Sequence, residues 1–372
     1  HCHPRLVSAI SDQAKQLGHT STLYVTEPQV EAARRLAEIA PGNLTKSFFS
    51  NSGTEAIDTA IMLACIHTGR SEVIALRSAY HGRSTLATNL TGLSSWRPLA
   101  SALPSIKHTI APYPYRCRFD ADCDRVCADK CAQDLEDVIL ATTNGQPAAF
   151  LAETIQGAGG FIAPPAGYHQ RVAEIIRGYG GLLIIDEVQA GFGRTGKWFG
   201  IEHWDVVPDI MVMAKGVAGG MPVGATITTA EIAGSWTSKT ISTFGGNPIC
   251  MAAMAETLAV MVEEDVPANA ELRGRQLRAG LHALAEEFTW IGDVRGMGLM
   301  VAIELVQDRI TKEPDAARTA ALMEETKSEG LLLGKAGLRD NVLRFGPSLL
   351  VTEEEVEDCL HRLRRACSWI DS

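Results

Sequence analysis

The chain has 372 residues, of which 46% are hydrophobic, so it exceeds one compact core and two domains are expected. Its 34 Lys and Arg residues against 44 Asp and Glu give a formal net charge of −10, which argues against nucleic acid or an anionic membrane as a partner. No stretch of about 18 uncharged apolar residues occurs, so no transmembrane helix is predicted.

Nine cysteines are scattered along the chain, which suits a reducing compartment better than a disulfide framework. The first residue is His1 rather than Met, so we expect the native start to lie upstream, where a targeting peptide would not be visible. The predicted location is therefore the cytoplasm, with the mitochondrial matrix as the alternative.

Short apolar runs alternate with amphipathic stretches through most of the chain, a pattern typical of βα units around a mostly parallel sheet. The predicted strands are Ser47–Ser50, Val73–Leu76, Ala149–Glu153, Leu182–Val188, Asp209–Ala214 and Val223–Thr228. The predicted helices include Glu55–Thr68, Tyr168–Gly178 and Ile249–Glu263. We therefore predict an α/β fold, with a large domain over residues 1–265.

The rhythm changes after about Val266. The elements predicted there are a helix over Glu271–Phe288, a strand over Gly298–Val306, a helix over Ala316–Ser328, a strand over Val342–Phe345 and a final helix. This pattern indicates a smaller α+β domain over residues 266–372.

Polar residues follow several of the predicted strands, and ligands of open α/β sheets bind beyond the carboxyl ends of strands. After the first strand, Asn51-Ser52-Gly53-Thr54-Glu55-Ala56 opens a helix whose free N–H groups suit a phosphate; the alternative is an ordinary N-cap. After the second comes Tyr80-His81-Gly82, an aromatic pair that suits either stacking on a flat ring or packing in the core.

The third and fourth predicted strands carry carboxylates. Glu153 ends the third and is followed by Gln156-Gly157-Ala158-Gly159-Gly160, where glycine would let the backbone approach a ligand. Asp186 ends the apolar run of the fourth, and Gln189 lies three residues on, where it could bond a ring hydroxyl. If the ligand contains a pyridine ring, a carboxylate sheltered from water here would keep the ring nitrogen protonated.

Lys215 ends the next apolar run, Pro208-Asp209-Ile210-Met211-Val212-Met213-Ala214. Burial there would strip water from its ammonium group and lower its pKa. The neutral amine forms Schiff bases with carbonyls, which is how pyridoxal phosphate (PLP) is attached in enzymes. A lysine or an acid at a strand end is common by itself, but Lys215 and Asp186 together indicate a PLP site.

Two other sequence patterns are typical of different kinds of site. Gly191-Phe192-Gly193-Arg194-Thr195-Gly196-Lys197 matches part of a P-loop, but Trp198 follows where that motif needs Ser or Thr, so nucleotide hydrolysis is not predicted. Four cysteines cluster at Cys117, Cys123, Cys127 and Cys131. They lack the short C-x2-C knuckle of zinc sites, so we predict no metal and leave a structural metal as the open alternative.

The chain strongly resembles the class III aminotransferases, PLP enzymes of fold type I, over essentially its whole length. The segment from Asp186 to Gly196 and the pair Lys215-Gly216 match the family signature nearly throughout. Further matches are Asn51 to Ala56, Tyr80 to Gly82, Thr243-Phe244-Gly245-Gly246-Asn247-Pro248 and Leu343-Arg344-Phe345. The cysteine-bearing insert looks most like the branch of alanine–glyoxylate aminotransferases and ethanolamine-phosphate phospho-lyases.

The resemblance implies a role for each matching residue. Lys215 would bond the cofactor and move a proton between it and the substrate, and Asp186 would pair with the pyridine nitrogen. The other implied cofactor contacts are Ser52, Gly53 and Thr54 at the phosphate, Tyr80 stacked on the ring with His81 beside it, and Glu153 and Gln189 on the side of the ring hydroxyl. Thr243 would reach the phosphate in the neighbouring subunit, which implies a homodimer with shared active sites.

Arg344 matches the arginine that binds a substrate carboxylate, for which its bidentate fork is well shaped. Members of the family that use ω-amino donors often carry a glutamate that shields this arginine, five residues after the position of Glu153. Ala158 stands there in this chain and would leave Arg344 available. The family also has a segment before the position of His1 that contributes to the substrate pocket, and this sequence does not include it.

The sequence therefore predicts a PLP-dependent aminotransferase that moves an amino group from an amino donor to a small 2-oxo acid such as pyruvate or glyoxylate. The alternative is a PLP-dependent phospho-lyase acting on a phosphorylated amine, because Arg344 would serve a phosphate as readily as a carboxylate. A cofactor-binding homologue without activity is disfavoured because Lys215 and Asp186 are both present.

Overall fold

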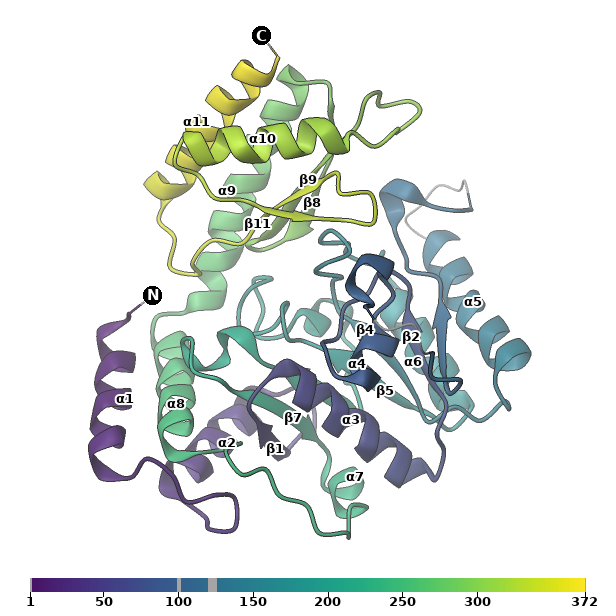
Figure 1. Cartoon of the computed structure of the whole chain (residues 1–372), viewed down its shortest axis with the longest axis vertical. Coiled ribbons are helices and arrows are strands. Elements are labelled where there is room, and N and C mark those ends of the chain that lie inside the picture. The colour runs from purple at the N-terminus through teal and green to yellow at the C-terminus, as the bar shows by residue number, and fades with distance from the viewer. Residues whose placement is uncertain (1, 99–101, 120–125, 372) are drawn as a thin grey trace.

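Two sheets organise the computed structural model, which describes residues 2–98, 102–119 and 126–371 (Figure 1). The strands of the larger sheet are β1 (Lys46–Ser50), β2 (Val73–Leu76), β3 (Ile106–Thr109), β4 (Ala149–Glu153), β5 (Leu182–Asp186), β6 (Ile210–Met213) and β7 (Gly224–Thr228). Their order is β1-β7-β6-β5-β4-β2-β3, and β7 alone runs against the others. The carboxyl ends of β1, β2, β4, β5 and β6 therefore meet at one edge of the sheet.

Helices cover both faces of this sheet. The helices of this part of the chain are α1 (Pro4–Gln16), which packs on α8, α2 (Glu27–Ile39), α3 (Gly53–Thr68), α4 (Thr85–Leu90), α5 (Val126–Thr142), α6 (Tyr168–Gly178), α7 (Ala230–Gly234), which packs on α3, and α8 (Pro248–Glu263), with short 3-10 turns at Ser94–Trp96, Pro114–Arg116, Gly200–Trp204 and Lys215–Ala218. Successive strand residues point to opposite faces, so Leu151 packs in the cluster under α3 while Phe150 packs in the cluster under α5, α6 and α8. Burial on both faces explains why these strands are continuous apolar runs.

The smaller sheet lies at the C-terminal end of the molecule, at the top of Figure 1. Its strands are β8 (Ile291–Met297), β9 (Met300–Leu305), β10 (Gly334–Ala336) and β11 (Val342–Phe345), paired antiparallel in the order β10-β11-β9-β8. Helices α9 (Val266–Glu287), α10 (Ala316–Ser328) and α11 (Glu353–Ile370) pack with it around a separate core that includes Leu277, Leu343 and Leu363.

The predicted α/β class is confirmed, and most predicted elements differ from the structure by at most two residues at their ends. The strand predicted over Leu182–Val188 was too long: β5 ends at Asp186, whose Oδ1 accepts a hydrogen bond of 3.0 Å from the Val188 N–H and turns the chain. The helix predicted from Glu271 begins earlier, at Val266.

Strands β3, β8 and β10 were not predicted, because they are short or only partly buried and so carry a weak apolar pattern. The division between residues 265 and 266 falls between α8 and α9 and stays a prediction. Among the described residues, no helix is both long and apolar enough to cross a membrane.

Candidate active site

A cavity of about 570 Å³ lies where the strand ends of the larger sheet meet. Every residue that the sequence analysis placed in the site lines it except Thr243; these are Ser52, Gly53, Thr54, Tyr80, His81, Glu153, Asp186, Gln189, Lys215 and Arg344. The parallel strands bring them together, because each of these residues lies at a strand end or in the loop or helix start that follows one, except Arg344, which comes from β11 of the smaller sheet.

Asp186 and His81 form a buried pair at the floor of the cavity. His81 Nδ1 lies 2.8 Å from Asp186 Oδ2, and the exposed fractions of the two side chains are 0% and 4%. The other oxygen of Asp186 accepts the Val188 N–H. Because Asp186 is held from both sides, its carboxylate has a fixed direction. This pairing could not be predicted from local sequence, since 105 residues separate the two partners.

Glu153 lies next to Asp186, because the two residues are partners in the register of β4 and β5. Its oxygens accept the N–H groups of Tyr80 and Gly157 at 2.9 and 2.8 Å. Burial, with the nearby Asp186 charge, raises the pKa of Glu153 to about 7, although His81 and the two backbone donors act in the opposite direction. Glu153 therefore ties the loops after β2 and β4 to the floor of the site.

Lys215 follows β6 and reaches into the same cavity, where its Nζ donates a 3.0 Å hydrogen bond to Gln189 Oε1. Burial lowers the pKa of Lys215, and the carboxylates of Asp186 and Glu153 oppose that shift. Its backbone φ is 50°, a left-handed conformation that costs a lysine on the order of 1 kcal/mol or more and is often found at functional sites. The structure thus places at this strand end a lysine whose pKa is lowered, in the direction expected from the sequence, and whose side chain is still open to the cavity.

The segment Ser52-Gly53-Thr54 opens α3 beneath the cavity. Ser52 is the N-cap and its Oγ accepts the Glu55 N–H at 3.2 Å, so the ordinary capping role is real. The N–H groups of Gly53 and Thr54 belong to the first helical turn and have no acceptor among the described residues. The backbone is also tightly packed here, since a Cβ on Gly82 would lie 2.4 Å from Thr54 Oγ1. An anion could accept these N–H groups without displacing anything.

Arg344 enters the cavity from the smaller sheet. Its Nη1 donates to the Gly157 carbonyl at 3.2 Å and its Nη2 to the Lys335 carbonyl at 3.3 Å, while its Nε is buried without a partner. The guanidinium lies over the ring of Phe161, 5.3 Å from its centroid. Among the described residues no carboxylate forms an ion pair with Arg344. Ala158 lines the cavity where a shielding glutamate would stand.

Glycine at position 157 is required by close packing between these groups. A Cβ there would lie 2.2 Å from Gln189 Oε1 and 3.2 Å from Glu153 Oε2, so any side chain would displace the partner of Lys215. The unpartnered Nε2 of His81 and Nε of Arg344 are buried polar atoms at this cavity. Such atoms are costly unless a ligand or water satisfies them, so the donor set fits an anionic, ring-shaped cofactor.

The cavity contains residues that were not predicted, and it lacks one predicted residue. Trp96 and the segment from Gly220 to Val223 also line the cavity, and Tyr80 meets Trp96 edge-on with ring centroids 5.0 Å apart. A lone tryptophan in a loop carried no signal in the sequence. Thr243 is absent from the cavity and is exposed in the loop before α8.

The cysteine cluster is only partly within the described residues, because Cys123 lies outside them. Cys127 and Cys131 are buried on α5 with sulfurs 3.8 Å apart. Together with Cys117 they line a second, smaller cavity. Across the residues that the structure describes, no group of three or more His, Cys, Asp or Glu side chains is arranged to hold a metal ion.

Comparison with known proteins places the chain in a family. The model of the family "Aminotransferase class-III" matches residues 1–367. The chain is 41% identical to alanine–glyoxylate aminotransferase 2 homolog 2, mitochondrial, of Arabidopsis thaliana, over 96% of this chain and 74% of that protein. It is 35% identical to alanine–glyoxylate aminotransferase 2, mitochondrial, of Pongo abelii, over 98% of this chain and 75% of that protein.

Solved structures agree with this assignment. An amine transaminase from an uncultivated Pseudomonas species, in a PLP-bound form, superimposes with a TM-score of 0.94 at 31% identity, covering 99% of this chain and 87% of that one. At this identity the similarity extends beyond the fold to the family, and it confirms the fold type I architecture that the resemblance implied.

The site also yields a prediction about pH and stability through Glu187, which is fully buried next to Asp186. Its oxygens accept hydrogen bonds from Thr154 and from the Gly200 and Ile201 N–H groups, and burial raises its pKa from 4.5 to about 7. The folded state holds this proton more tightly than the unfolded state does. The resulting stability is therefore fully present below pH 4.5 and is lost as the pH rises through about 7.

We expect Glu187→Gln to remove this part of the pH dependence, which amounts to about 2 kcal/mol of unfolding free energy between about pH 5 and about pH 8. Denaturant unfolding at several pH values would measure the slope, with the exposed Glu286→Gln as the matched control. An unchanged slope in Glu187→Gln would contradict the prediction, whatever the absolute loss from its broken hydrogen bonds.

Proposed function

We propose a cofactor and a substrate class for this chain on one premise: the chain belongs to the class III aminotransferases, a PLP-dependent family. The proposed cofactor is PLP, and the proposed acceptor is a small 2-oxo acid such as pyruvate or glyoxylate. The observation that carries the proposal is that Lys215, whose pKa is lowered, shares one cavity with the buried Asp186–His81 pair.

The residues of the cavity divide the work of such a reaction among them. The free N–H groups of Gly53 and Thr54, with the Ser52 hydroxyl, would hold the cofactor phosphate. Asp186, fixed by His81, would face the pyridine nitrogen. PLP, when bound, supplies a carbonyl for the amino group and a ring that accepts electrons from the substrate Cα.

Lys215 would serve as the base that takes the proton from the substrate Cα and returns it to the former carbonyl carbon of the cofactor, on the other side of the transferred nitrogen. Its lowered pKa favours the neutral amine that this task needs. Gln189 holds Nζ within 3.0 Å, which limits where the proton can be delivered. Trp96 and Tyr80 would close the site beside the cofactor ring and keep water from the reacting bond.

Arg344 supports the proposal for the substrate class. It lies at the cavity without an ion-pair partner among the described residues and with a buried, unsatisfied Nε. A short 2-oxo acid has its carboxylate beside the reacting carbon, so pairing with Arg344 would also orient that carbon. The names of the aminotransferases from Arabidopsis thaliana and Pongo abelii point to alanine and glyoxylate as such substrates. No observation favours phosphate elimination.

A homodimer is also proposed. Leu23, Tyr24, Val25, Ile241 and Phe244 are large apolar residues that remain exposed. The two segments that carry them are joined, since Thr22 Oγ1 donates to the Ser242 carbonyl at 3.2 Å and the rings of His19 and Phe244 lie 4.7 Å apart. An apolar surface of this kind suits a protein partner, and Thr243 lies within it. A second copy seated here would bring Thr243 to the partner's cofactor phosphate.

The compartment stays a prediction. The two mitochondrial relatives named above support the mitochondrial matrix as a location beside the cytoplasm. We propose no membrane or nucleic acid partner.

The first test concerns attachment of the cofactor. Borohydride treatment of the PLP-loaded protein should fix the label on Lys215 and not on Lys197, because Lys215 lines the cavity and an amine of lowered pKa is deprotonated at lower pH. Peptide mass spectrometry identifies the site. A label on Lys197 alone, or none, would refute the proposed cofactor.

The second test removes the charge of Asp186. Asp186→Asn keeps the shape and a hydrogen bond to His81, so cofactor should still bind, but the rate of the half-reaction should fall at least about a hundredfold, or about 2.7 kcal/mol. Stopped-flow absorbance of the bound cofactor measures that rate. A rate within about threefold of the unmodified protein would exclude Asp186 from the mechanism.

The third test addresses the substrate and the rival reaction. Arg344→Lys keeps the charge but loses the fork, so KM for pyruvate or glyoxylate should rise at least about tenfold while the affinity for PLP stays unchanged. The same assays should follow release of inorganic phosphate from phosphoethanolamine. Phosphate release without transfer of an amino group to either 2-oxo acid would establish the lyase instead.

The fourth test disrupts the proposed dimer. Replacing Val25 and Ile241 with Glu places two charges on the exposed apolar surface, so the dimer should dissociate at least about tenfold more readily and PLP should bind more weakly. Sedimentation velocity and cofactor titration measure the two effects. Leu332→Glu is the matched control, since Leu332 is equally exposed but lies in the smaller domain. A monomer that binds PLP as tightly as any dimer would contradict shared sites.

A further inference from the structure

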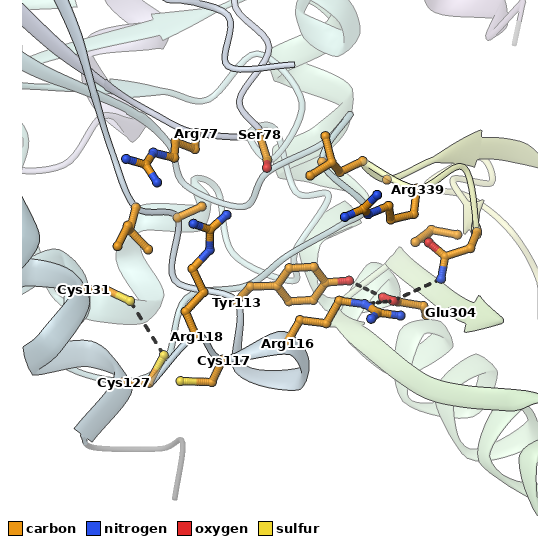
Figure 2. A pocket seen from close by; sticks show the side chains of 17 residues that line it. Arg77, Ser78, Tyr113, Arg116, Cys117, Arg118, Cys127, Cys131, Glu304 and Arg339 are labelled. Carbon is orange, nitrogen blue, oxygen red and sulfur yellow. Dashed lines mark hydrogen bonds and ion pairs between the residues drawn. The ribbon is translucent and has the colours of Figure 1, made fainter. Parts of the chain in front are cut away.

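A second cavity, of about 220 Å³, lies between the two sheets and is lined by four arginines, Arg77, Arg116, Arg118 and Arg339. Figure 2 shows their side chains around the cavity together with Ser78, Tyr113 and the cysteines of α5. The cavity shares no lining residue with the candidate active site. The concentration of positive charge is notable because the chain as a whole carries a formal charge of −10.

One of the four arginines is neutralised within the protein. Arg116 Nε lies 2.5 Å from Glu304 Oε1, and Glu304 is shared with Arg295, which also pairs with Asp293 at 2.6 Å. Two positive and two negative charges therefore balance in this network. Tyr113 donates its hydroxyl to Glu304 as well and closes the cavity wall on that side.

The other three arginines are not neutralised by any described residue. Arg77, Arg118 and Arg339 form no ion pair and no side-chain hydrogen bond within residues 2–98, 102–119 and 126–371, and each is exposed toward solvent. Guanidinium groups that line one cavity without an acidic partner repel one another, so the cavity has a positive potential that favours an anion.

Two details of the walls indicate a site rather than a chance gap. Arg116 Nη2 is buried and has no hydrogen-bond partner. A buried donor without an acceptor destabilises the folded state unless a ligand or water accepts its hydrogen bond. Ser78 has a φ of 63°, a left-handed conformation that is uncommon outside glycine and asparagine and that is often found where a backbone serves a ligand.

We propose that this arginine-lined cavity is a binding site, separate from the active site, for a small anion with two or more negative groups, either phosphates or carboxylates. A volume of about 220 Å³ is below the roughly 300–1,000 Å³ of sites for drug-sized ligands, so the anion is small rather than a nucleotide. Guanidinium groups on several walls favour two or more separated charges over a single one.

The position of the cavity links it to the active site. Ala158 lines the active-site cavity, whereas the next residue, Gly159, lines the arginine-lined cavity. Gly337, at its other wall, donates its N–H to the Ala158 carbonyl at 3.0 Å. A bound anion would therefore hold together the loop after β4 and the turn between β10 and β11. That turn leads into β11, the strand that contains Arg344.

Calorimetric titration of the purified, PLP-loaded protein tests the proposal. Pyrophosphate and citrate are the probes, with inorganic phosphate and with chloride at matched ionic strength as references. Pyrophosphate tests a preference for phosphate groups and citrate a preference for carboxylates. We expect at least one of the two to bind with a Kd below about 1 mM and at least about tenfold more tightly than inorganic phosphate. No saturable binding of either probe, or no preference over inorganic phosphate, overturns the proposal.

Variants locate the binding. Arg118→Gln with Arg339→Gln should weaken the preferred probe at least about tenfold, whereas the equally charged control Arg275→Gln with Arg364→Gln should not, because those two arginines lie on α9 and α11 away from the cavity. Arg344→Ala should leave the affinity unchanged. Equal weakening in the control pair, or loss of binding in Arg344→Ala, shows that binding is nonspecific or belongs to the active site, and overturns the proposal.

Acidic residues of the chain itself could pair with these arginines in place of a bound anion, and a further variant tests this. The sequence carries Asp120, Asp122 and Asp124 just after Arg118, outside the described residues. Replacing all three with Asn should leave the affinity for the probe within about threefold if a ligand is the natural partner of the arginines. Binding that appears only in this triple variant shows that the chain's own aspartates neutralise the cavity, and overturns the proposal.

Discussion

The parallel alignment of β4, β5 and β6 is the constraint on which the rest of the site depends. It sets Glu153 and Asp186 side by side at one edge of the sheet and brings Lys215 to the same edge from the next strand. Side chains at the middle of these strands are fully buried on both faces, so a shift in register would move each side chain out of the core it fits and into the other one. The position of the chemistry is therefore fixed by apolar packing well away from it.

Burial at that edge has opposite consequences for acids and amines. Removing water raises the pKa of Glu153 and of Glu187 to about 7 and lowers the pKa of Lys215. The site remains stable because each buried carboxylate accepts several hydrogen bonds, from His81 and Val188 at Asp186 and from backbone N–H groups at the two glutamates. The same loss of water that lowers the pKa of the lysine would destabilise the buried carboxylates without these donors.

The smaller sheet completes the cavity through a few polar contacts to the glycine-rich loop after β4. Arg344 donates to the Gly157 carbonyl and Arg295 to the Gly160 carbonyl at 2.8 Å, so two arginines from the smaller sheet hold this loop of the larger sheet. That loop separates the candidate active site from the arginine-lined cavity. The glycines of this loop have no side chains, so groups on both of its sides can approach the backbone closely. This explains why one loop can form a wall of both cavities.

The sequence by itself determined the local parts of this protein: the apolar runs that became strands, the cap at Ser52, and the types and order of the residues that follow each strand. These depend on periodicity and on neighbours along the chain, and the position of Lys215 at the end of a buried strand could be read in this way. Only the tertiary structure decided the pairing of His81 with Asp186, the wall formed by Trp96 and the meeting of Arg77, Arg118 and Arg339 around one cavity. Those contacts join residues far apart in the chain, and strand order and domain packing set their distances, which no local pattern of residues encodes.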